Sequence, residues 1–346
     1  MPTTLVTGGN GFVGATVVST LLSSKFNHRV ILAVRSVASA EALIAIHPEW
    51  PADNVVIASV PDFTVPGAFD EIFKSHSEID YVIHVAAPLL DDPRNNEFVE
   101  HFEKPNVLGN IGILTSAKQF GKNVKAISVT GSVNAITLGD QDDVKKRVFG
   151  NKEWLVQGRE DAIKAQHNYI SYCVGKKVAE QALWKFVEEE KPSFTVTNFM
   201  PPLIFGPMEQ KVASAAKINF SNSQIQAILN SAKAEGGKVP STIFPGYIDV
   251  RDLAELQILA LTTPGAANKR FVVGFPMMFN RFAEALRNVP EYSSRIGENN
   301  DDDEKLTSAR FGTDEAEAVF QFKFRSLEET AKDVAASIVK VEAQAA

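Results

Sequence analysis

A tyrosine, a lysine and a serine in this chain have the types and spacing that support proton transfer. Tyr172 and Lys176 are four residues apart in a segment with helical periodicity, so they share one helix face. A free phenol has a pKa near 10, and an ammonium within about 4–6 Å is expected to lower it by roughly 1–3 units. Ser132 follows an apolar strand, where its hydroxyl can hold a substrate oxygen. These residues predict a site that exchanges a proton with a substrate oxygen near neutral pH.

The stretch from Thr4 to Ala15 has the pattern of a turn that binds a dinucleotide cofactor. A short apolar run breaks into Gly8, Gly11 and Gly14 and then into helical periodicity. In a dinucleotide-binding turn the first glycine allows a sharp bend, the second lets the backbone approach a pyrophosphate, and the third lets the helix lie close to the sheet. The N-terminus of that helix faces the anion. The pattern therefore predicts hydride exchange with a nicotinamide dinucleotide.

Arg35 indicates which dinucleotide this is. It ends the expected second strand, Arg29–Val34, about twenty residues beyond the glycine turn, where the ribose is contacted. An acid there would accept hydrogen bonds from the 2′-hydroxyl of NAD, whereas an arginine suits the 2′-phosphate of NADP. No acid occurs in residues 30–37, so we expect NADPH/NADP+. The alternative is that Arg35 only solvates the strand end.

Two further expected strands end at the same edge. Asp62 follows Val55–Ser59, and it either accepts a hydrogen bond from the adenine amino group or forms a turn beside the preceding proline. Tyr81–Val85 is the fourth expected strand, and His84 on it is expected to be a core histidine. The small residues that follow let the backbone approach a cofactor ribose: Ala86, Ala87 and Pro88.

The remaining pattern places the three proton-transfer residues on regular elements. A strand at Lys125–Val129 leads to Ser132, and one long amphipathic helix runs from Asn168 to Glu190 with Lys177 in solvent. Asn106 precedes the expected helix Val107–Phe120, where it either caps the helix or holds a water in a proton relay.

The overall pattern is typical of an α/β protein with a doubly wound parallel sheet and a smaller C-terminal substrate lobe. We expect residues 1–200 to form the NADP(H)-binding domain. Residues 201–346 then form the substrate lobe, interleaved with segments near 247–262 and 270–275 that return to the main domain. The charged segment 140–157 is expected to be a surface loop.

Composition excludes several classes of function. The chain has 346 residues and a net charge of −7, which argues against nucleic acid as a partner. No apolar segment approaches about 20 residues, and no basic and apolar leader is present, so we expect a cytoplasmic protein that does not bind membranes. One cysteine, Cys173, allows no intrachain disulfide, and the six histidines lack metal-ligand spacing, so no metal is expected. We expect a monomer or a homodimer.

The chain resembles the extended short-chain dehydrogenases/reductases, whose T-G-x-x-G-x-x-G and Y-x-x-x-K motifs match Thr7–Gly14 and Tyr172–Lys176. Within that superfamily it is most similar to fungal methylglyoxal/aldehyde (carbonyl) reductases, and more distantly to dihydroflavonol and cinnamoyl-CoA reductases. Further segments that carry the similarity are Val82–Pro88, Pro201–Pro207, Tyr247–Asp252 and Phe322–Thr330. The resemblance implies a cytosolic, NADPH-dependent reductase of aldehydes and ketones with a mobile substrate lobe.

The resemblance also implies residue roles. The catalytic residues would be Ser132, Tyr172 and Lys176. The cofactor contacts would be Gly8, Gly9, Asn10, Gly11, Phe12, Val13, Arg35, Asp62, Phe63, Tyr172, Lys176, Ile204 and Ser221. The substrate pocket would be lined by Pro88, Val133, Thr137 and Leu203.

This chain departs from its relatives at four of these positions or their neighbours. Gly131 and Gly175 stand where the relatives usually carry serine. Val133 and Leu203 stand where the relatives often carry aromatic residues, which predicts a more aliphatic or roomier substrate pocket. A second basic residue near Arg35 is missing as well, so the preference for NADPH could be modest.

Two other functions use the same fold. A nucleotide-sugar epimerase or dehydratase also uses tyrosine and lysine but keeps NAD tightly bound, and Arg35 and the aliphatic pocket argue against it. A non-catalytic NADP(H) sensor would have no need of Ser132, Tyr172 and Lys176 together.

Overall fold

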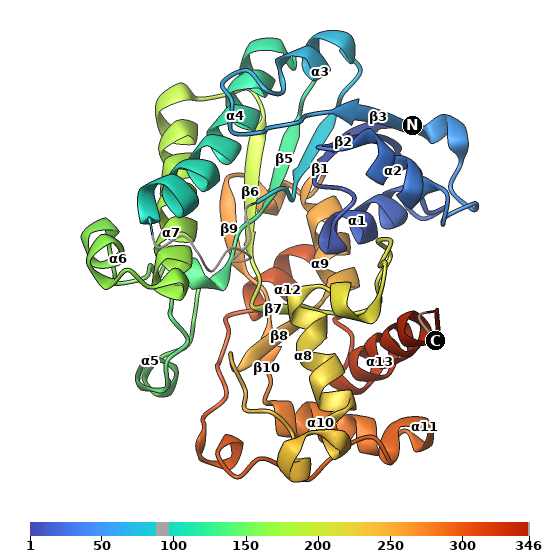
Figure 1. Cartoon of the computed structure of the whole chain (residues 1–346). Coiled ribbons are helices and arrows are strands. Elements are labelled where there is room, and N and C mark those ends of the chain that lie inside the picture. Colours follow the sequence, from blue (N-terminus) through green and yellow to red (C-terminus); the bar gives the residue numbers. More distant parts are fainter. Residues whose placement is uncertain (88–96, 345–346) are drawn as a thin grey trace.

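A seven-stranded parallel sheet forms the upper part of the structure (Figure 1). The computed structural model describes residues 1–87 and 97–344. The strand order is β3-β2-β1-β4-β5-β6-β9, so the winding direction reverses between β1 and β4, where ligands bind in open α/β sheets. The strands are β1 (Thr3–Thr7), β2 (Arg29–Val34), β3 (Val55–Ser59), β4 (Tyr81–His84), β5 (Ala126–Thr130), β6 (Thr195–Met200) and β9 (Lys269–Val272).

Helices cover both faces of this sheet, which is why its central strands are continuous apolar runs. Successive side chains on a strand point to opposite faces. Leu5 therefore packs with α3 (Asp70–Ser75), α4 (Lys104–Phe120) and α7 (Asn168–Glu190). Its neighbour Val6 packs with α1 (Phe12–Leu22), α2 (Val37–Ile44) and α9 (Val250–Ala260). The expected doubly wound fold is confirmed.

A second, three-stranded sheet organises the smaller lobe, with strand order β10-β8-β7. Its strands are β7 (Leu203–Phe205), β8 (Gly246–Asp249) and β10 (Phe275–Pro276). Its helices are α8 (Phe220–Leu229), α10 (Phe279–Arg287), α11 (Pro290–Ser293) and α13 (Leu327–Gln344), which share one apolar core. Figure 1 shows this lobe below the large sheet.

Two segments from the second half of the chain lie with the first half. Strand β9 pairs with β6 in the large sheet, in register from Thr197 opposite Lys269 to Met200 opposite Val272. Helix α9 packs against α1, and α12 (Asp314–Phe320) packs near α9 and β9. The proposed division at residue 200 stays a prediction. The contacts of α9 and β9 agree with its expectation that segments near 247–262 and 270–275 return to the main domain.

Some expected boundaries differ from the structure. Helix α4 begins at Lys104, three residues before the expected start at Val107. The charged segment 140–157 is not all loop, since α5 (Gln141–Lys146) lies in it, capped by the Asp140 side chain on the Asp143 amide, and α6 (Arg159–Ala165) follows. Local capping chemistry in a short polar segment explains the helix that periodicity missed.

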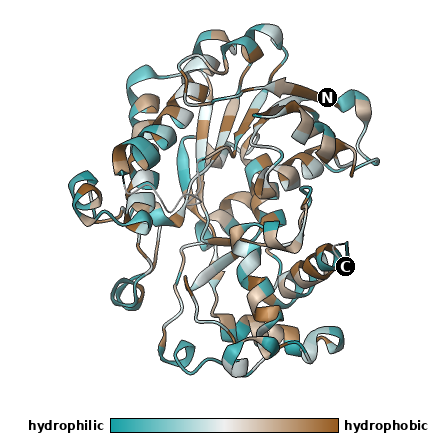
Figure 2. Ribbon diagram, viewed as in Figure 1, coloured by the Kyte–Doolittle hydropathy of each residue, from teal (hydrophilic) through white to brown (hydrophobic). Residues whose placement is uncertain are grey.

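Figure 2 shows hydrophobic residues gathered along the strands and hydrophilic residues on outlying helices such as α5. Across residues 1–87 and 97–344, we find no helix with the length and apolarity that crossing a bilayer requires.

Candidate active site

Ser132 lies just beyond the carboxyl end of β5. Gly131 precedes it because a Cβ at that position would lie 2.7 Å from the Asn198 amide nitrogen and 3.0 Å from the Phe199 carbonyl oxygen. Ser132 is 7% exposed and begins a short 3₁₀ turn, in which its hydroxyl oxygen accepts from the Asn134 amide at 3.2 Å. The close packing of β5 on β6 thus explains why glycine occupies position 131 and fixes where the serine points.

Helix α7 carries Tyr172 and Lys176 to the same place. The helix packs so closely on the turn before α4 that a Cβ at Gly175 would lie 3.1 Å from the Phe102 carbonyl oxygen. The Lys176 ammonium nitrogen lies 5.5 Å from the centre of the Tyr172 ring. The Ser132 hydroxyl is near enough to the Tyr172 phenol to lower the phenol's pKa, while it donates to the Asn134 side-chain oxygen at 3.3 Å. The structure therefore brings the three expected residues together.

The pKa of Tyr172 does not shift as the sequence predicts. Burial raises the pKa of its phenol to about 12, and the hydrogen bond from Ser132 only partly opposes this. Burial also lowers the pKa of Lys176 to about 8. The expected lowering of the phenol's pKa by the ammonium is thus wrong for the protein alone, because desolvation outweighs a charge 5.5 Å from the ring centre. Tyr172 is protonated throughout the neutral range.

The site's second layer contains two contacts that sequence reasoning missed. The Tyr169 hydroxyl accepts from the Asn134 side-chain amide at 2.9 Å and donates to the Leu138 carbonyl at 2.6 Å. Lys177, expected in solvent, instead donates to the carbonyls of Leu155 and Gln157 at 2.7 and 2.9 Å. Both sets of contacts tie α7 to loops after β5, and the sequence gives no signal for them because the partners are distant along the chain and three of the four are backbone carbonyls.

A cavity of about 20 Å³ lies beside Lys176, large enough for one water. Asn106 and Asn198 line it. The Asn106 side-chain amide nitrogen donates to the Phe102 carbonyl at 2.7 Å, while that of Asn198 is buried with no partner among the residues that the structure covers. A water here would satisfy Asn198, which favours the relay interpretation of Asn106 without testing it.

The glycine turn has the geometry that a pyrophosphate needs. Gly8 has φ +67°, and a Cβ there would lie 3.0 Å from the Ala86 backbone. A Cβ at Gly14 would lie 2.2 Å from the Gly8 carbonyl oxygen, so α1 starts directly against the end of β1. Gly11, the residue before α1, offers no capping side chain, and no acidic residue stands in the first turn. The amides at this helix start are therefore suited to an anion.

Arg35 lies at the neighbouring strand end. It is exposed, and the next residue, Ser36, caps α2 through the Ser39 amide. The Asn10 side-chain amide donates to the Ser39 hydroxyl at 2.7 Å, which ties the glycine turn to α2. These groups place a guanidinium and two hydroxyls beside the turn and fit a phosphate on the ribose. The residues present thus fit NADPH.

Residues 4–274 match the NAD dependent epimerase/dehydratase family. The chain belongs to this family. The match spans the glycine turn, Ser132, Tyr172 and Lys176 and ends just after β9.

Within the epimerase/dehydratase family, the most similar proteins include fungal reductases. The chain is 29% identical over 345 residues to the ketoreductase azaE of Aspergillus niger, covering 97% of each chain. It is 29% identical over 350 residues to the NADPH-dependent methylglyoxal reductase GRE2 of Saccharomyces cerevisiae, covering 97% of this chain and 98% of the other. The solved structure of yeast methylglyoxal/isovaleraldehyde reductase Gre2 with NADPH has a TM-score of 0.82 at 27% identity, covering 99% of both chains. The resemblance inferred from the motifs is confirmed.

The other residues expected to contact the cofactor differ in their contacts and in their burial. Asp62 accepts from both the amide and the hydroxyl of Thr64, at 2.8 and 2.6 Å, which is the turn alternative. Phe63 packs on α4, where a Cβ at Gly109 would lie 2.8 Å from its ring. The Ala86 amide donates to the Thr7 hydroxyl oxygen, and a Cβ at Gly9 would lie 2.2 Å from the Leu32 side chain. Ile204 and Ser221 are half-buried in β7 and α8, and Phe12 and Val13 begin α1.

The expected substrate residues are mostly closed off. Val133 and Thr137 have no exposed surface, and the Thr137 hydroxyl donates to the Asp143 carboxylate at 2.6 Å. Tight packing of the loop after β5 covers both side chains in this structure, and their place in the substrate pocket stays a prediction. Leu203 is half-buried, and Pro88 lies outside the described residues.

Two further residues near the site are buried, and one of them, His84, was expected to be a core residue. His84 is 2% exposed, and its Nδ1 lies 2.8 Å from the Thr7 hydroxyl, whereas its Nε2 has no partner in the described parts of the chain. Burial and the nearby Lys176 lower the pKa of His84 to about 3, so it is neutral. Cys173 is fully buried, and burial raises its pKa to about 12, which makes it a packing residue rather than a nucleophile.

Proposed function

We propose that this protein is an NADPH-dependent reductase that converts the carbonyl groups of aldehydes and ketones to alcohols. The observation that carries the proposal is the grouping of Ser132, Tyr172 and Lys176 at the sheet edge that also bears the glycine turn. Its similarity to a fungal ketoreductase and a methylglyoxal reductase over nearly the whole chain supports it.

Each of the three residues has a defined step in carbonyl reduction. Bound NADPH supplies hydride to the carbonyl carbon. Tyr172, with a pKa of about 12, arrives protonated and gives its proton to the carbonyl oxygen as negative charge develops there. Ser132 donates a hydrogen bond to the same oxygen and fixes its angle. Lys176 stabilises the phenolate that remains, since its ammonium lies beside the ring.

The polar groups near the glycine turn support NADPH over NADH. Arg35 supplies the cation for the 2′-phosphate, and Ser36 and Ser39 supply hydroxyls on the first turn of α2. The glycine turn, from Gly8 to Val13, would hold the pyrophosphate through its amides.

For the substrate we propose methylglyoxal-like and bulkier carbonyl compounds. Leu203 is half-buried, and it follows β6 at the same sheet edge as Ser132. An aliphatic side chain there leaves more room than an aromatic one and favours apolar groups beside the carbonyl. We also propose, from composition, a cytoplasmic protein that is a monomer or a homodimer.

The test is NADPH and NADH oxidation against a panel of methylglyoxal, bulky ketones and hydroxycinnamyl aldehydes. We expect turnover with NADPH, and Tyr172→Phe should lower kcat by about 10²–10⁴-fold while NADPH binding persists. Tyr81→Phe is the matched control, because Tyr81 begins β4 at the opposite end of the sheet, and it should keep full activity.

The same experiment separates the alternatives. Purified protein that carries tightly bound NAD and shows no net oxidation would favour the epimerase or dehydratase. Binding of NADPH with activity unchanged by Tyr172→Phe would favour the sensor. The sensor alternative does not explain why a protonated phenol and a serine hydroxyl lie beside Lys176.

A further inference from the structure

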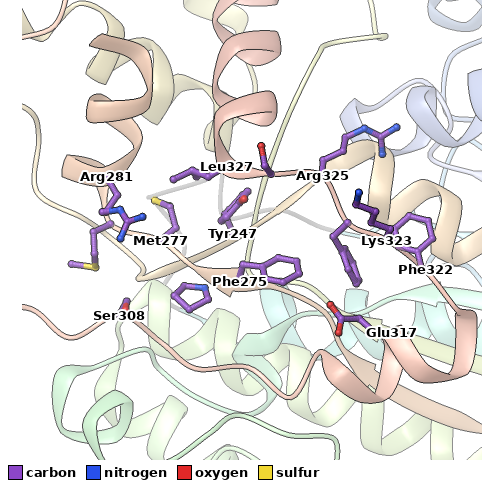
Figure 3. Close-up of a pocket in the computed structure, with 14 residues that line it drawn as sticks. Tyr247, Phe275, Met277, Arg281, Ser308, Glu317, Phe322, Lys323, Arg325 and Leu327 are labelled. Atoms are coloured by element: carbon purple, nitrogen blue, oxygen red, sulfur yellow. The ribbon is translucent and has the colours of Figure 1, made fainter. Parts of the chain in front are cut away.

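A cavity of about 710 Å³ lies in the smaller lobe, away from the site described above (Figure 3). Its walls come from β8, β10, the start of α10 and the segment 322–327 that leads into α13. None of Ser132, Tyr172, Lys176 or Leu203 lines it. In the three-stranded sheet, β8 lies between β7, which carries Leu203, and β10, which forms part of the cavity wall. The central strand therefore separates β10 from the proposed substrate region.

Aromatic side chains form the cavity's apolar surface. Phe275 and Phe324 meet edge to face with ring centres 4.9 Å apart, and Phe324 meets Phe322 in the same way at 5.0 Å. Tyr247 pairs with Phe275 across the strands and lines the interior, next to Met277. Ring edges and faces held in fixed positions favour an aromatic guest over a flexible alkyl chain.

The Tyr247 hydroxyl is available to a polar group on that guest. Tyr247 lines the cavity, and its hydroxyl forms no hydrogen bond within residues 1–87 and 97–344; it is not among the buried unpartnered polar atoms of that part of the chain, so it is open to the cavity. Burial raises the pKa of this phenol, so it stays protonated and is available as a donor. A protonated phenol that faces the cavity can donate a hydrogen bond to an acceptor on a ligand.

Two cations give that acceptor its charge. Arg281 and Lys323 line the cavity, and neither has a carboxylate within 4 Å in the described part of the chain. Arg325 beside them differs, because it is engaged by Asp252, Glu255 and Glu329. Figure 3 shows Arg281 and Lys323 at opposite ends of the cavity, with Tyr247 and Phe275 between them. The carboxylate of Glu317 also lines the cavity, so Arg281 and Lys323 together leave the lining with an excess of positive charge, which favours an anion locally.

We propose that this cavity binds an aromatic molecule that carries a carboxylate. The ring lies among Phe275, Phe324 and Tyr247, and the carboxylate accepts from the Tyr247 hydroxyl and pairs with Arg281 or Lys323. A volume of about 710 Å³ is in the range of small-molecule sites. The proposal does not depend on the proposed reductase activity, because the two sites share no residue.

The experiment uses 2-naphthoate as the probe and 2-naphthylmethanol as its neutral isostere, titrated calorimetrically into the full-length protein. We expect 2-naphthoate to bind at least tenfold more tightly, because a charge-assisted hydrogen bond contributes about that factor or more. The double variant Arg281→Ala/Lys323→Ala should remove this difference. Lys332→Ala, an exposed lysine on α13 outside the cavity, should keep it.

Further arms locate the site. Tyr247→Phe should weaken 2-naphthoate by about five- to tenfold and leave 2-naphthylmethanol unchanged. Saturating NADPH should leave the affinity for 2-naphthoate unchanged. Equal binding of the two probes, no loss in the double variant, or competition with NADPH would each overturn the proposal. Near-ultraviolet circular dichroism of every variant confirms that a loss of binding does not reflect unfolding.

Discussion

The ammonium nitrogen of Lys176 lies 5.5 Å from the centre of the Tyr172 ring, and burial shifts their pKa values in opposite directions. The phenol's pKa rises to about 12 and the lysine's falls to about 8, although the two groups titrate close together when free. Lys176 therefore loses its proton first, and Tyr172 keeps its proton over the whole neutral range. This order suits a residue that must begin the reaction as an acid.

The first prediction is the pH dependence of carbonyl reduction. Lys176 has a lowered pKa, so its charge is present below about pH 8 and is lost as the pH rises through that value. We expect kcat/KM for reduction to be level below about pH 7 and to fall up to tenfold per unit above pH 8. Lys176→Arg should abolish this fall, even if it lowers the level, because a guanidinium stays charged. A profile still level at pH 9.5 would contradict the role of Lys176.

Alcohol oxidation should show the opposite dependence. That direction needs the Tyr172 phenolate, whose fraction increases about tenfold per unit while the pH is below about 12. Rates of NADP+ reduction at fixed alcohol should therefore rise from pH 7 and level off above about pH 8, where Lys176 loses the charge that stabilises the phenolate. A rate that peaks near pH 7 would mean that bound cofactor moves the phenol's pKa well below its value in the protein alone.

Arg35→Asp should reverse the cofactor preference. The change removes the cation for the 2′-phosphate and supplies an acceptor for the 2′-hydroxyl, so kcat/KM should fall with NADPH and rise with NADH. Lys122→Asp makes the same change of charge on an exposed turn before β5 and should leave the ratio as it is. Equal use of NADPH and NADH by the unaltered protein would count against this function of Arg35.

Gly14→Ala should weaken NADPH binding by at least tenfold, because a Cβ there would lie 2.2 Å from the Gly8 carbonyl oxygen and would push α1 off the turn. Gly112→Ala is the matched control within α4, since its Cβ would make only ordinary contacts from 3.7 Å outward. Alanine is the better helix former, so that control should be neutral or slightly stabilising. Fluorescence titration with NADPH measures both, and equal affinities would contradict the close approach.

Glu180→Gln should destabilise the fold by about 3–5 kcal/mol, because it leaves a buried guanidinium unpaired. Arg270 donates to both Glu180 oxygens at 2.8 and 2.9 Å, and the two side chains are 11% and 3% exposed. Glu189→Gln removes a pair with Lys185 that is 3.9 Å long and mostly in solvent, so it should change the free energy of unfolding by less than about 0.5 kcal/mol. Urea unfolding compares the two, and similar losses would show that the buried pair is not special.

The fold was predictable where an apolar run marks a buried strand or a helical periodicity continues over many residues. The ranges expected for the second and third strands and for the long helix equal those of β2, β3 and α7. Boundaries moved where side-chain caps decide them, as at Asp140 before α5. The periodicity of apolar residues reveals a helix only when one of its faces is buried. A short capped helix in a polar segment buries few apolar side chains and so leaves no such pattern.

The candidate site was predictable in its residues more than in its energetics. Spacing on one helix face and position at a strand end brought Tyr172, Lys176 and Ser132 together, although their roles stay predictions. The sign of the Tyr172 pKa shift could not be inferred, because burial depends on packing from β5 and α4 that one sequence does not display. The contacts of Lys177 with two distant carbonyls were hidden for the same reason.

Strand β9 has a practical consequence for anyone who wishes to dissect this protein. It enters the large sheet from beyond the smaller lobe, pairs along β6 from Thr197 to Met200, and carries Arg270 to its partner on α7. A fragment that stops at residue 200 would leave β6 as an unpaired edge strand and would leave Glu180 buried without its partner Arg270. Such a fragment should aggregate rather than fold. The nucleotide-binding half therefore cannot be produced by truncation alone, and a circular permutation that keeps β9 would be needed.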